Sequence, residues 1–300
     1  MTTTEVTVRV PGKINLVLRS GPRRPDGYHS LATVFQAVSI YDDVTASPAA
    51  PGQFSVRTLG RYADATPLAD DNIAVRAARL VASKAPDPSA LGCHLTIRKD
   101  IPLTGGMAGG SADAAGSLLA CATMWGLDVP LDELAVDLGA DVPFCLHGGT
   151  ALGSDRGDRL TPVPSQGTYH WVLALAEGGL STPSVFERYD RLNPDGTSPL
   201  EVSPALFDAL ATGDPAALGR ALVNDLQDSA TDLRPDLRPV LDAAATLGAL
   251  GAVLSGSGPT VAFLVADEAA AETFAAQLAA QRLAHAVRHV TGPVAGASVV

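Results

Sequence analysis

A glycine-rich loop that leads directly into a helix is the feature that most constrains how this chain can fold. Residues 102–113 read PLTGGMAGGSAD, with four glycines in twelve positions. Glycine lacks a Cβ atom, so this backbone can adopt positive φ and approach a ligand closely. The alanine-rich segment 112–125 has apolar residues at helical spacing, which disfavours a flexible linker. A helix beginning near Gly110 would direct its free N–H groups into the loop, which predicts an anion site, most commonly for phosphate.

The composition of the loop also limits which kind of phosphate site it can be. It does not end in the Lys-Ser/Thr pair of a Walker-type ATPase. A strand expected at 94–98 precedes it, as in dinucleotide-binding folds. However, no acidic residue closes a second strand about 20 residues further on, as that fingerprint requires.

Length, composition and charge restrict the class of protein and its partners. Three hundred residues suit two modest domains or one large one, and 46% hydrophobic with 18% charged residues is typical of globular proteins. No apolar run approaches the length of a membrane span, and the first residues lack signal-peptide features, so we expect a cytoplasmic protein. The widely separated Cys93, Cys121 and Cys145 fit reduced thiols rather than disulfides or a zinc site. A net charge of −11 argues against nucleic acid or an anionic membrane as partner.

Apolar periodicity and turn signals predict an α+β chain with two domains, residues 1–164 and 165–300, and a cleft between them. For the first domain we expect helices at 72–83, 110–125 and 131–138, and strands at 6–10, 14–19, 31–40, 53–58, 94–98, 144–147, 151–152 and 160–163. For the second we expect strands at 171–176, 261–265 and 285–290, and helices at 184–190, 205–211, 215–226, 238–247 and 268–281. The last strand could return to pack on the first domain.

Two segments carry polar residues suited to chemistry, and each has a structural alternative. Lys13 and Asn15 alternate with apolar residues, so both side chains leave the same face of one strand, toward either solvent or a ligand. Asp141 follows a helix and stands between a glycine and a proline in LGADVPF. It could cap a turn, the commoner use of aspartate there. Alternatively it is a partly desolvated carboxylate suited to general-base catalysis.

Two further segments complete the set of candidate sites. In RRPDGYH, Tyr28 could stack on a flat ring and His29 could read the edge of a heterocycle, or the segment is a hairpin turn held by the tyrosine. The segment LSGSGPT, which contains Gly256 and Gly258, is a second glycine-rich turn before a strand and is a weak signal alone.

Taken together, PGKINL, PLTGGMAGGSA and LSGSG resemble the three motifs of the GHMP small-molecule kinases, in the expected order. The resemblance covers most of the chain. It implies an α+β fold of two domains, the first like domain 2 of ribosomal protein S5 and the second an α/β sandwich, with the active site in the cleft. ATP would be the co-substrate and Mg²⁺ would arrive with it. The enzyme would be a monomer or a homodimer.

RRPDGYH and LGADVPF, supported by the segments 71–73, 181–186 and 223–226, resemble one branch of that family. Its acceptor is a methylerythritol alcohol linked to cytidine diphosphate, in the non-mevalonate route to isoprenoids. The branch implies that Asp141 is the general base and Lys13 its charge partner. It implies that the cytosine is sandwiched by Tyr28 and Phe186 and read by His29. The remaining implied acceptor contacts are Asn15, Thr182, Gly256 and Gly258.

The resemblance also implies the ATP side of the site. Asn72 would contact adenine, and Ser111 would lie near the phosphates and Mg²⁺. The phosphate loop would comprise Pro102, Leu103, Thr104, Gly105, Gly106, Met107, Ala108, Gly109, Gly110, Ser111 and Ala112. Thr104 and Ala108 stand where the family usually has glycine, Met107 where it has leucine, and Pro22 where it has glycine. We expect that Ala108 avoids positive φ, where alanine would be strained, or that the loop relaxes there.

Two alternative functions fit parts of this pattern. One is a different kinase of the same family, of the homoserine or mevalonate type, whose acceptor has no base for Tyr28 to stack on. The other is a non-catalytic small-molecule sensor on the same fold, which the presence of both Lys13 and Asp141 disfavours.

Overall fold

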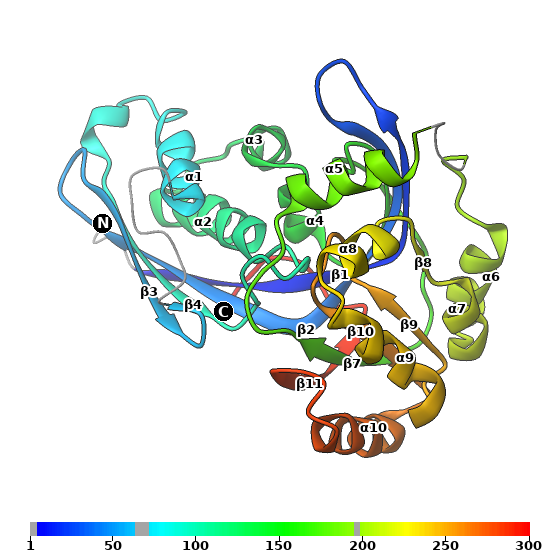
Figure 1. The fold of residues 1–300 in the computed structure, drawn as a ribbon. Helices are drawn as coiled ribbons and strands as arrows, with labels where there is room; N and C mark the ends of the chain where they lie inside the picture. Colours follow the sequence, from blue (N-terminus) through cyan, green and yellow to red (C-terminus); the bar gives the residue numbers. More distant parts are fainter. Residues whose placement is uncertain (1–4, 64–71, 195–198) are drawn as a thin grey trace.

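The computed structural model describes residues 5–63, 72–194 and 199–300, and within these ranges eight strands form the larger of two sheets (Figure 1). The strand order is β12-β1-β2-β4-β3, with β5 on β2, β6 on β5 and β8 on β1. These strands are β1 (Val6–Arg23), β2 (His29–Pro48), β3 (Phe54–Gly60), β4 (Cys93–Lys99), β5 (Thr150–Asp155), β6 (Arg159–Pro162), β8 (Val223–Asn224) and β12 (Ser298–Val299). Strands β8 and β12 come from the C-terminal half, so strands from both halves of the chain pair with β1.

The smaller sheet has the order β11-β7-β10-β9 and is antiparallel throughout. Its strands are β7 (Tyr169–Leu175), β9 (Gly251–Leu254), β10 (Val261–Val265) and β11 (Ala286–Gly292). The helices around it are α5 (Thr182–Leu192), α6 (Pro204–Thr212), α7 (Pro215–Ala221), α8 (Gln227–Leu233), α9 (Leu237–Leu247) and α10 (Glu268–Ala280). The α+β class expected from the sequence is confirmed. Among the described residues, no helix is long and apolar enough to cross a membrane.

Helix α2 (Gly109–Trp125) packs on β1 and β2 and thereby sets the position of the glycine-rich loop before it. Its neighbours on this side of the sheet are α1 (Ile73–Ala82), α3 (Leu131–Leu138) and α4 (Val142–His147), and a 3-10 turn spans Pro88–Ala90 (Figure 1). The approach of α2 is close, because a Cβ on Gly116 would lie 2.6 Å from a methyl of Val44 and 2.9 Å from one of Val10. Small residues along α2 therefore place its N-terminus against the middle of β1.

Strand β1 is longer than the sequence pattern indicated. The segments 6–10 and 14–19 were expected as separate strands because a Pro-Gly pair divides them. In the structure they form one strand, and the pairing with β2 shifts register between Pro11 and Gly12. The Pro-Gly pair therefore marks a bulge rather than an end, and Lys13 follows immediately.

Two other expectations about local structure were wrong, and one strand was missed. Residues 144–147, expected as a strand, belong to helix α4, which has Pro143 in its first turn. A short apolar run does not distinguish a strand from a buried helix, so the pattern could not decide this case. The helix expected over 215–226 ends at Ala221, after which the chain forms β8 and then α8. Strand β9 was missed because it merges into the second glycine-rich turn.

Direct contacts join the two sheets. The indole N–H of Trp171 on β7 donates to Gln36 Oε1 on β2 at 3.0 Å. The backbone N–H of Thr291 on β11 donates to Ser39 Oγ at 2.8 Å. Trp171 and Gln36 are both fully buried, so the junction is part of the core and holds the sheets in a fixed relation.

A buried ionic cluster fastens the start of α2 to the sheet. Lys99 Nζ at the end of β4 lies 2.5 Å from Asp42 Oδ2 and 2.8 Å from Asp113 Oδ2, and it donates to the carbonyl of Gly109 at 3.1 Å. Asp42 also accepts the backbone N–H groups of Asp100 and Ile101. Because one ammonium serves two carboxylates with almost no exposure, burial raises the pKa of Asp113 to about 7.

Replacing Lys99 should destabilise the fold strongly. Lys99→Met would leave two buried carboxylates without their cation, and we expect a loss of about 3–5 kcal/mol in the free energy of unfolding. Urea unfolding followed by circular dichroism measures this. Lys84→Met is the matched control, because Lys84 is exposed and its replacement should change stability by less than about 0.5 kcal/mol. Equal losses in the two variants would contradict a stabilising role for the cluster.

Candidate active site

Strand β1 places Lys13 and Asn15 inside the protein rather than toward solvent. Lys13 is 4% exposed and Asn15 is 2% exposed, so the solvent-facing alternative is wrong. Lys13 Nζ donates to Asn15 Oδ1 at 2.8 Å and to the carbonyl of Gly106 at 2.9 Å. The amide of Asn15 donates to Thr33 Oγ1 at 2.7 Å, which in turn donates to the carbonyl of Val17. These bonds fix the ammonium directly beside the glycine-rich loop.

Asp141 lies at the start of α4, and its carboxylate faces Lys13. Its side chain makes no capping hydrogen bond to that helix. Instead, Asp141 Oδ2 lies 3.7 Å from Lys13 Nζ, with the carboxylate 33% exposed and the ammonium 5% exposed. The pair therefore combines a fixed, desolvated cation with a carboxylate that solvent or a substrate can reach.

The two glycine-rich segments meet at the carbonyl of Gly106. Ser255 Oγ donates to this carbonyl at 2.9 Å, so the carbonyl accepts from both Ser255 and Lys13. The approach requires glycine, because Gly106 has φ +76° and a Cβ there would lie 1.9 Å from the carbonyl oxygen of Ser255. The second glycine-rich turn, which was a weak signal in the sequence alone, thus contributes Ser255 to the same site. Gly256 contributes too, since a Cβ on it would lie 3.3 Å from Lys13 Nζ.

The expectation that Ala108 avoids positive φ is wrong. Ala108 precedes α2 with φ 61° and ψ 32°, in the left-handed region. The loop cannot relax at this position, because its neighbour Met107 is fully buried and accepts a hydrogen bond from the backbone N–H of Lys13. Thr104, the other departure from glycine, also has positive φ, at 49°. Both residues thus place a Cβ where the backbone conformation favours glycine.

The residues expected to recognise a base lie at the hairpin between β1 and β2 and on α5. His29 is buried, and its ring stacks on Phe186 with a centroid distance of 4.6 Å. Tyr28 is 56% exposed and stacks instead beneath the guanidinium of Arg156, which lies 5.5 Å from the ring centroid. Thr182 Oγ1 lies 2.8 Å from Ser257 Oγ, which links α5 to the second glycine-rich turn. In this structure Phe186 therefore contacts His29 rather than Tyr28.

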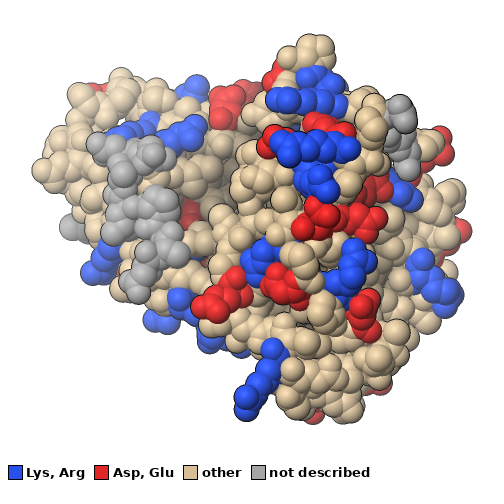
Figure 2. All heavy atoms as spheres, viewed as in Figure 1, with Lys and Arg blue, Asp and Glu red and all other residues tan. Residues whose placement is uncertain are grey.

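Sequence reasoning missed a carboxylate at this end of the site. Asp190 Oδ1 lies 2.7 Å from His29 Nε2, and Asp190 follows Phe186 by four residues on α5. That spacing puts both side chains on one helical face, which is the signal that could have identified Asp190. Figure 2 shows basic side chains over the β1–β2 hairpin and α5, interleaved with acidic ones. Arg24, for example, is ion-paired with both Asp26 and Asp155.

Asn72, which was expected to contact adenine, has a structural role in the helix that follows it. Its side chain caps α1 by accepting the backbone N–H of Ala74 at 2.9 Å, and it is 7% exposed. The sequence motif to which it belongs begins at Asp71, which lies outside the described residues.

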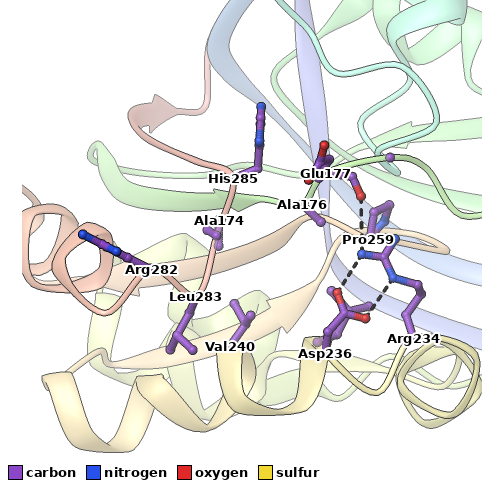
Figure 3. Close-up of a pocket in the computed structure, with 13 residues that line it drawn as sticks. Ala174, Ala176, Glu177, Arg234, Asp236, Val240, Pro259, Arg282, Leu283 and His285 are labelled. Carbon is purple, nitrogen blue, oxygen red and sulfur yellow. Dashed lines mark hydrogen bonds and ion pairs between the residues drawn. The ribbon is translucent and has the colours of Figure 1, made fainter.

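A cavity of about 550 Å³ lies elsewhere, beside the end of β7 and near α9 (Figure 3). Its lining includes Pro259, which follows the second glycine-rich turn, and Arg234, whose guanidinium already bonds Asp236 and the carbonyl of Glu177. None of the candidate catalytic residues lines it. The candidate active site therefore lies where Lys13, Asp141 and the two glycine-rich segments meet, and not at this cavity.

Known proteins with the same arrangement identify the family. Residues 72–149 match the GHMP kinases N terminal domain, and residues 206–284 match the GHMP kinases C terminal domain. The chain is 51% identical to the 4-diphosphocytidyl-2-C-methyl-D-erythritol kinase of Thermobifida fusca (strain YX), with 99% of each chain covered. It is 52% identical to the kinase of that name from Mycolicibacterium smegmatis, covering 100% of this chain and 94% of the relative. The chain belongs to the 4-diphosphocytidyl-2-C-methyl-D-erythritol kinase family.

Solved structures agree with this membership. A crystal structure of 4-(cytidine 5'-diphospho)-2C-methyl-D-erythritol kinase superposes with a TM-score of 0.78 at 31% identity, covering 95% of this chain and 98% of that one. Homoserine kinase from Cytophaga hutchinsonii superposes with a TM-score of 0.75 at 17% identity, covering 99% and 97%, which shows a shared fold alone. The resemblance to GHMP kinases is confirmed, and the chain is an ATP-dependent small-molecule kinase.

Placing glycine at position 108 should stabilise the protein. Ala108→Gly removes left-handed strain of about 1–2 kcal/mol and costs about 0.4–1 kcal/mol through the freer unfolded chain. We expect a net gain of about 0.5–1 kcal/mol in the free energy of unfolding, measured by urea titration. Ala120→Gly, in the buried interior of the same helix, is the control and should lose about 1 kcal/mol or more. A loss of stability in Ala108→Gly would show that the alanine is not strained.

Proposed function

We propose that this kinase transfers the γ-phosphoryl group of ATP to the C2 hydroxyl of 4-diphosphocytidyl-2-C-methyl-D-erythritol, in the methylerythritol phosphate route to isoprenoids. The products are the 2-phosphate and ADP, and the setting is the cytoplasm. The observation that carries the proposal is the 3.7 Å approach of Asp141 to Lys13 beside the carbonyl of Gly106. It puts a reachable carboxylate, a fixed cation and a phosphate-type loop in one place.

The chemistry asks Asp141 to act on a proton and Lys13 to act through its charge. As the C2 oxygen bonds to the γ-phosphorus, Asp141 accepts the hydroxyl proton, and the bond to the leaving ADP oxygen breaks. Lys13 offsets the negative charge of the transferring group. Neither role requires a covalent intermediate, because positioning and charge stabilisation supply most of the catalysis in phosphoryl transfer.

The residues of the loop fit a metal ion that is held chiefly by the nucleotide. The described part of the chain contains no cluster of three His, Cys, Asp or Glu side chains that could hold a metal by itself. Mg²⁺ commonly keeps several waters and binds through substrate phosphates with few protein ligands, and when bound it neutralises phosphate charge. Ser111, in the first turn of α2, supplies the hydroxyl that would reach the ion.

The acceptor end favours a substrate with a base. Asp190 holds His29 Nε2, so in neutral His29 the Nε2–H donates to the carboxylate and Nδ1 is an acceptor. In the described part of the chain Nδ1 has no hydrogen-bond partner, and an acceptor there suits the 4-amino group of cytosine. Phe186 and the exposed ring of Tyr28 are the groups between which the base would stack, with Thr182 and Asn15 toward the diphosphate and erythritol.

A kinase for a base-free alcohol of the homoserine or mevalonate type is the alternative within the same fold. The buried His29–Phe186 stack and Asp190 would have no task in that case. A substrate panel with ATP, followed by ADP release, distinguishes the two. Rapid turnover of homoserine or mevalonate would contradict the proposal, as would the absence of turnover with the cytidylyl substrate. Turnover of the cytidylyl substrate also excludes a non-catalytic sensor.

Removing the proposed base should reduce turnover without affecting binding. We expect Asp141→Asn to lower kcat by about 100- to 10,000-fold, with KM for both substrates within about threefold, in a coupled assay of ADP release. Asp132→Asn is the control, because Asp132 is exposed and pairs with His147. An unchanged kcat in Asp141→Asn would refute the assignment of the base.

Removing His29 should weaken the acceptor and leave ATP untouched. Base contacts of this kind are worth about 1–3 kcal/mol, so His29→Ala is expected to raise KM for the cytidylyl substrate roughly 5- to 150-fold. KM for ATP should stay within about twofold. His147→Ala is the matched control, since His147 is exposed and also pairs with an aspartate. Equal changes in both KM values would place His29 outside the acceptor site.

A further inference from the structure

The segment Val223–Asn224 and the two residues after it connect strand β1 to the second glycine-rich turn. Strand β8 pairs in parallel with β1, with Leu18 opposite Asn224. The backbone N–H of Asp225 donates to the carbonyl of Leu18, and the Asp225 carboxylate bonds Arg19 and the N–H of Ser20. This short strand is therefore anchored on one side to the strand that carries Lys13.

The side chain of Asn224 faces the opposite way, into the turn. Its amide nitrogen donates to the carbonyls of Leu254 and Gly256, both at 2.7 Å. Its Oδ1 accepts the backbone N–H of Leu226 at 2.9 Å. Asn224 is 8% exposed, so both donors and the acceptor are engaged away from water. Such a fully satisfied buried amide fixes backbone geometry.

One of the carbonyl groups that Asn224 holds belongs to Gly256, which lies beside Lys13. A Cβ on Gly256 would lie 3.3 Å from Lys13 Nζ and 3.4 Å from Asn15 Oδ1. The preceding residue, Ser255, donates to the carbonyl of Gly106, which also accepts from Lys13. A shift of this turn would therefore displace both the backbone beside Lys13 and the residue that bonds the same carbonyl as Lys13.

We propose that Asn224 is a positioning residue for phosphoryl transfer. It fixes the turn at residues 254–256 and thereby keeps Lys13 at hydrogen-bonding distance from the carbonyl of Gly106. The inference rests on the proposed function of Lys13. It assigns Asn224 no contact with either substrate. Its loss should consequently reduce kcat more than it changes binding, because small misplacements of catalytic groups cost up to about 100-fold in rate.

The test compares variants of Asn224 with one of its neighbour in the same segment. Asn224→Asp keeps the size and the acceptor for Leu226 but turns an oxygen toward two carbonyl oxygens, and Asn224→Ala removes all three bonds. We expect both to lower kcat about 10- to 100-fold with KM for ATP and for the cytidylyl substrate within about threefold. Asp225→Asn, whose bonds run to Arg19 and Ser20, should keep kcat within about threefold.

Thermal unfolding of each variant separates positioning from folding. If kcat falls only in proportion to the folded fraction, or falls equally in Asp225→Asn, Asn224 is merely structural and the inference is overturned. If the Asn224 variants do not fold, Ser255→Ala is the deciding variant, because it removes the hydrogen bond between the same turn and Gly106. An unchanged kcat in Ser255→Ala then overturns the inference. Absence of wild-type turnover would instead contradict the proposed function, and with it this inference.

A double-variant comparison adds a readout that a structural role would not give. If Asn224 and Ser255 act through the same turn, the combined loss of kcat in Asn224→Asp with Ser255→Ala should be smaller than the product of the separate losses. Independent losses that multiply would overturn the inference.

Discussion

The carbonyl of Gly106 is the point on which the arrangement of the site depends. Lys13 on β1 and Ser255 on the second glycine-rich turn both donate to it at 2.9 Å. These two donors belong to opposite halves of the chain, so one backbone oxygen joins the strand, the phosphate-type loop and the smaller sheet. A side chain at Gly106 would collide with Ser255, which explains why this loop needs glycine at that position.

Further contacts next to this carbonyl fix the conformation of the loop. Met107 is buried, and its carbonyl accepts the N–H of Lys13, so the loop is fixed immediately after Gly106 as well. Beyond Ala108, the first turn of α2 is held through Gly109 by Lys99. Strain at Ala108 is therefore tolerated because contacts on both sides determine its conformation, and the free N–H groups of α2 stay aimed at one place.

The sequence allowed prediction of those features that depend on local spacing. Alternation on β1 put Lys13 and Asn15 on one face, and the small residues after the loop indicated α2. The predictions that were wrong or missing concern features that local spacing does not determine. Ala108 adopts positive φ because Met107 is anchored by a strand ninety residues earlier, and residues 144–147 form a helix although their apolar run also suits a strand. Asp190 shares a helical face with Phe186, but its contact with His29 depends on how α5 packs, which the spacing does not specify.

A comparison of the two buried lysines indicates why one is structural and the other suits catalysis. Lys99 contacts two carboxylates within 2.8 Å, so its charge is more than balanced inside the protein. Lys13 instead has two neutral oxygens as close partners, and its carboxylate, Asp141, is 3.7 Å away and open to solvent. A desolvated ammonium that is incompletely neutralised attracts further negative charge. The transferring phosphoryl group would supply that charge, which relates the unusual environment of Lys13 to the reaction.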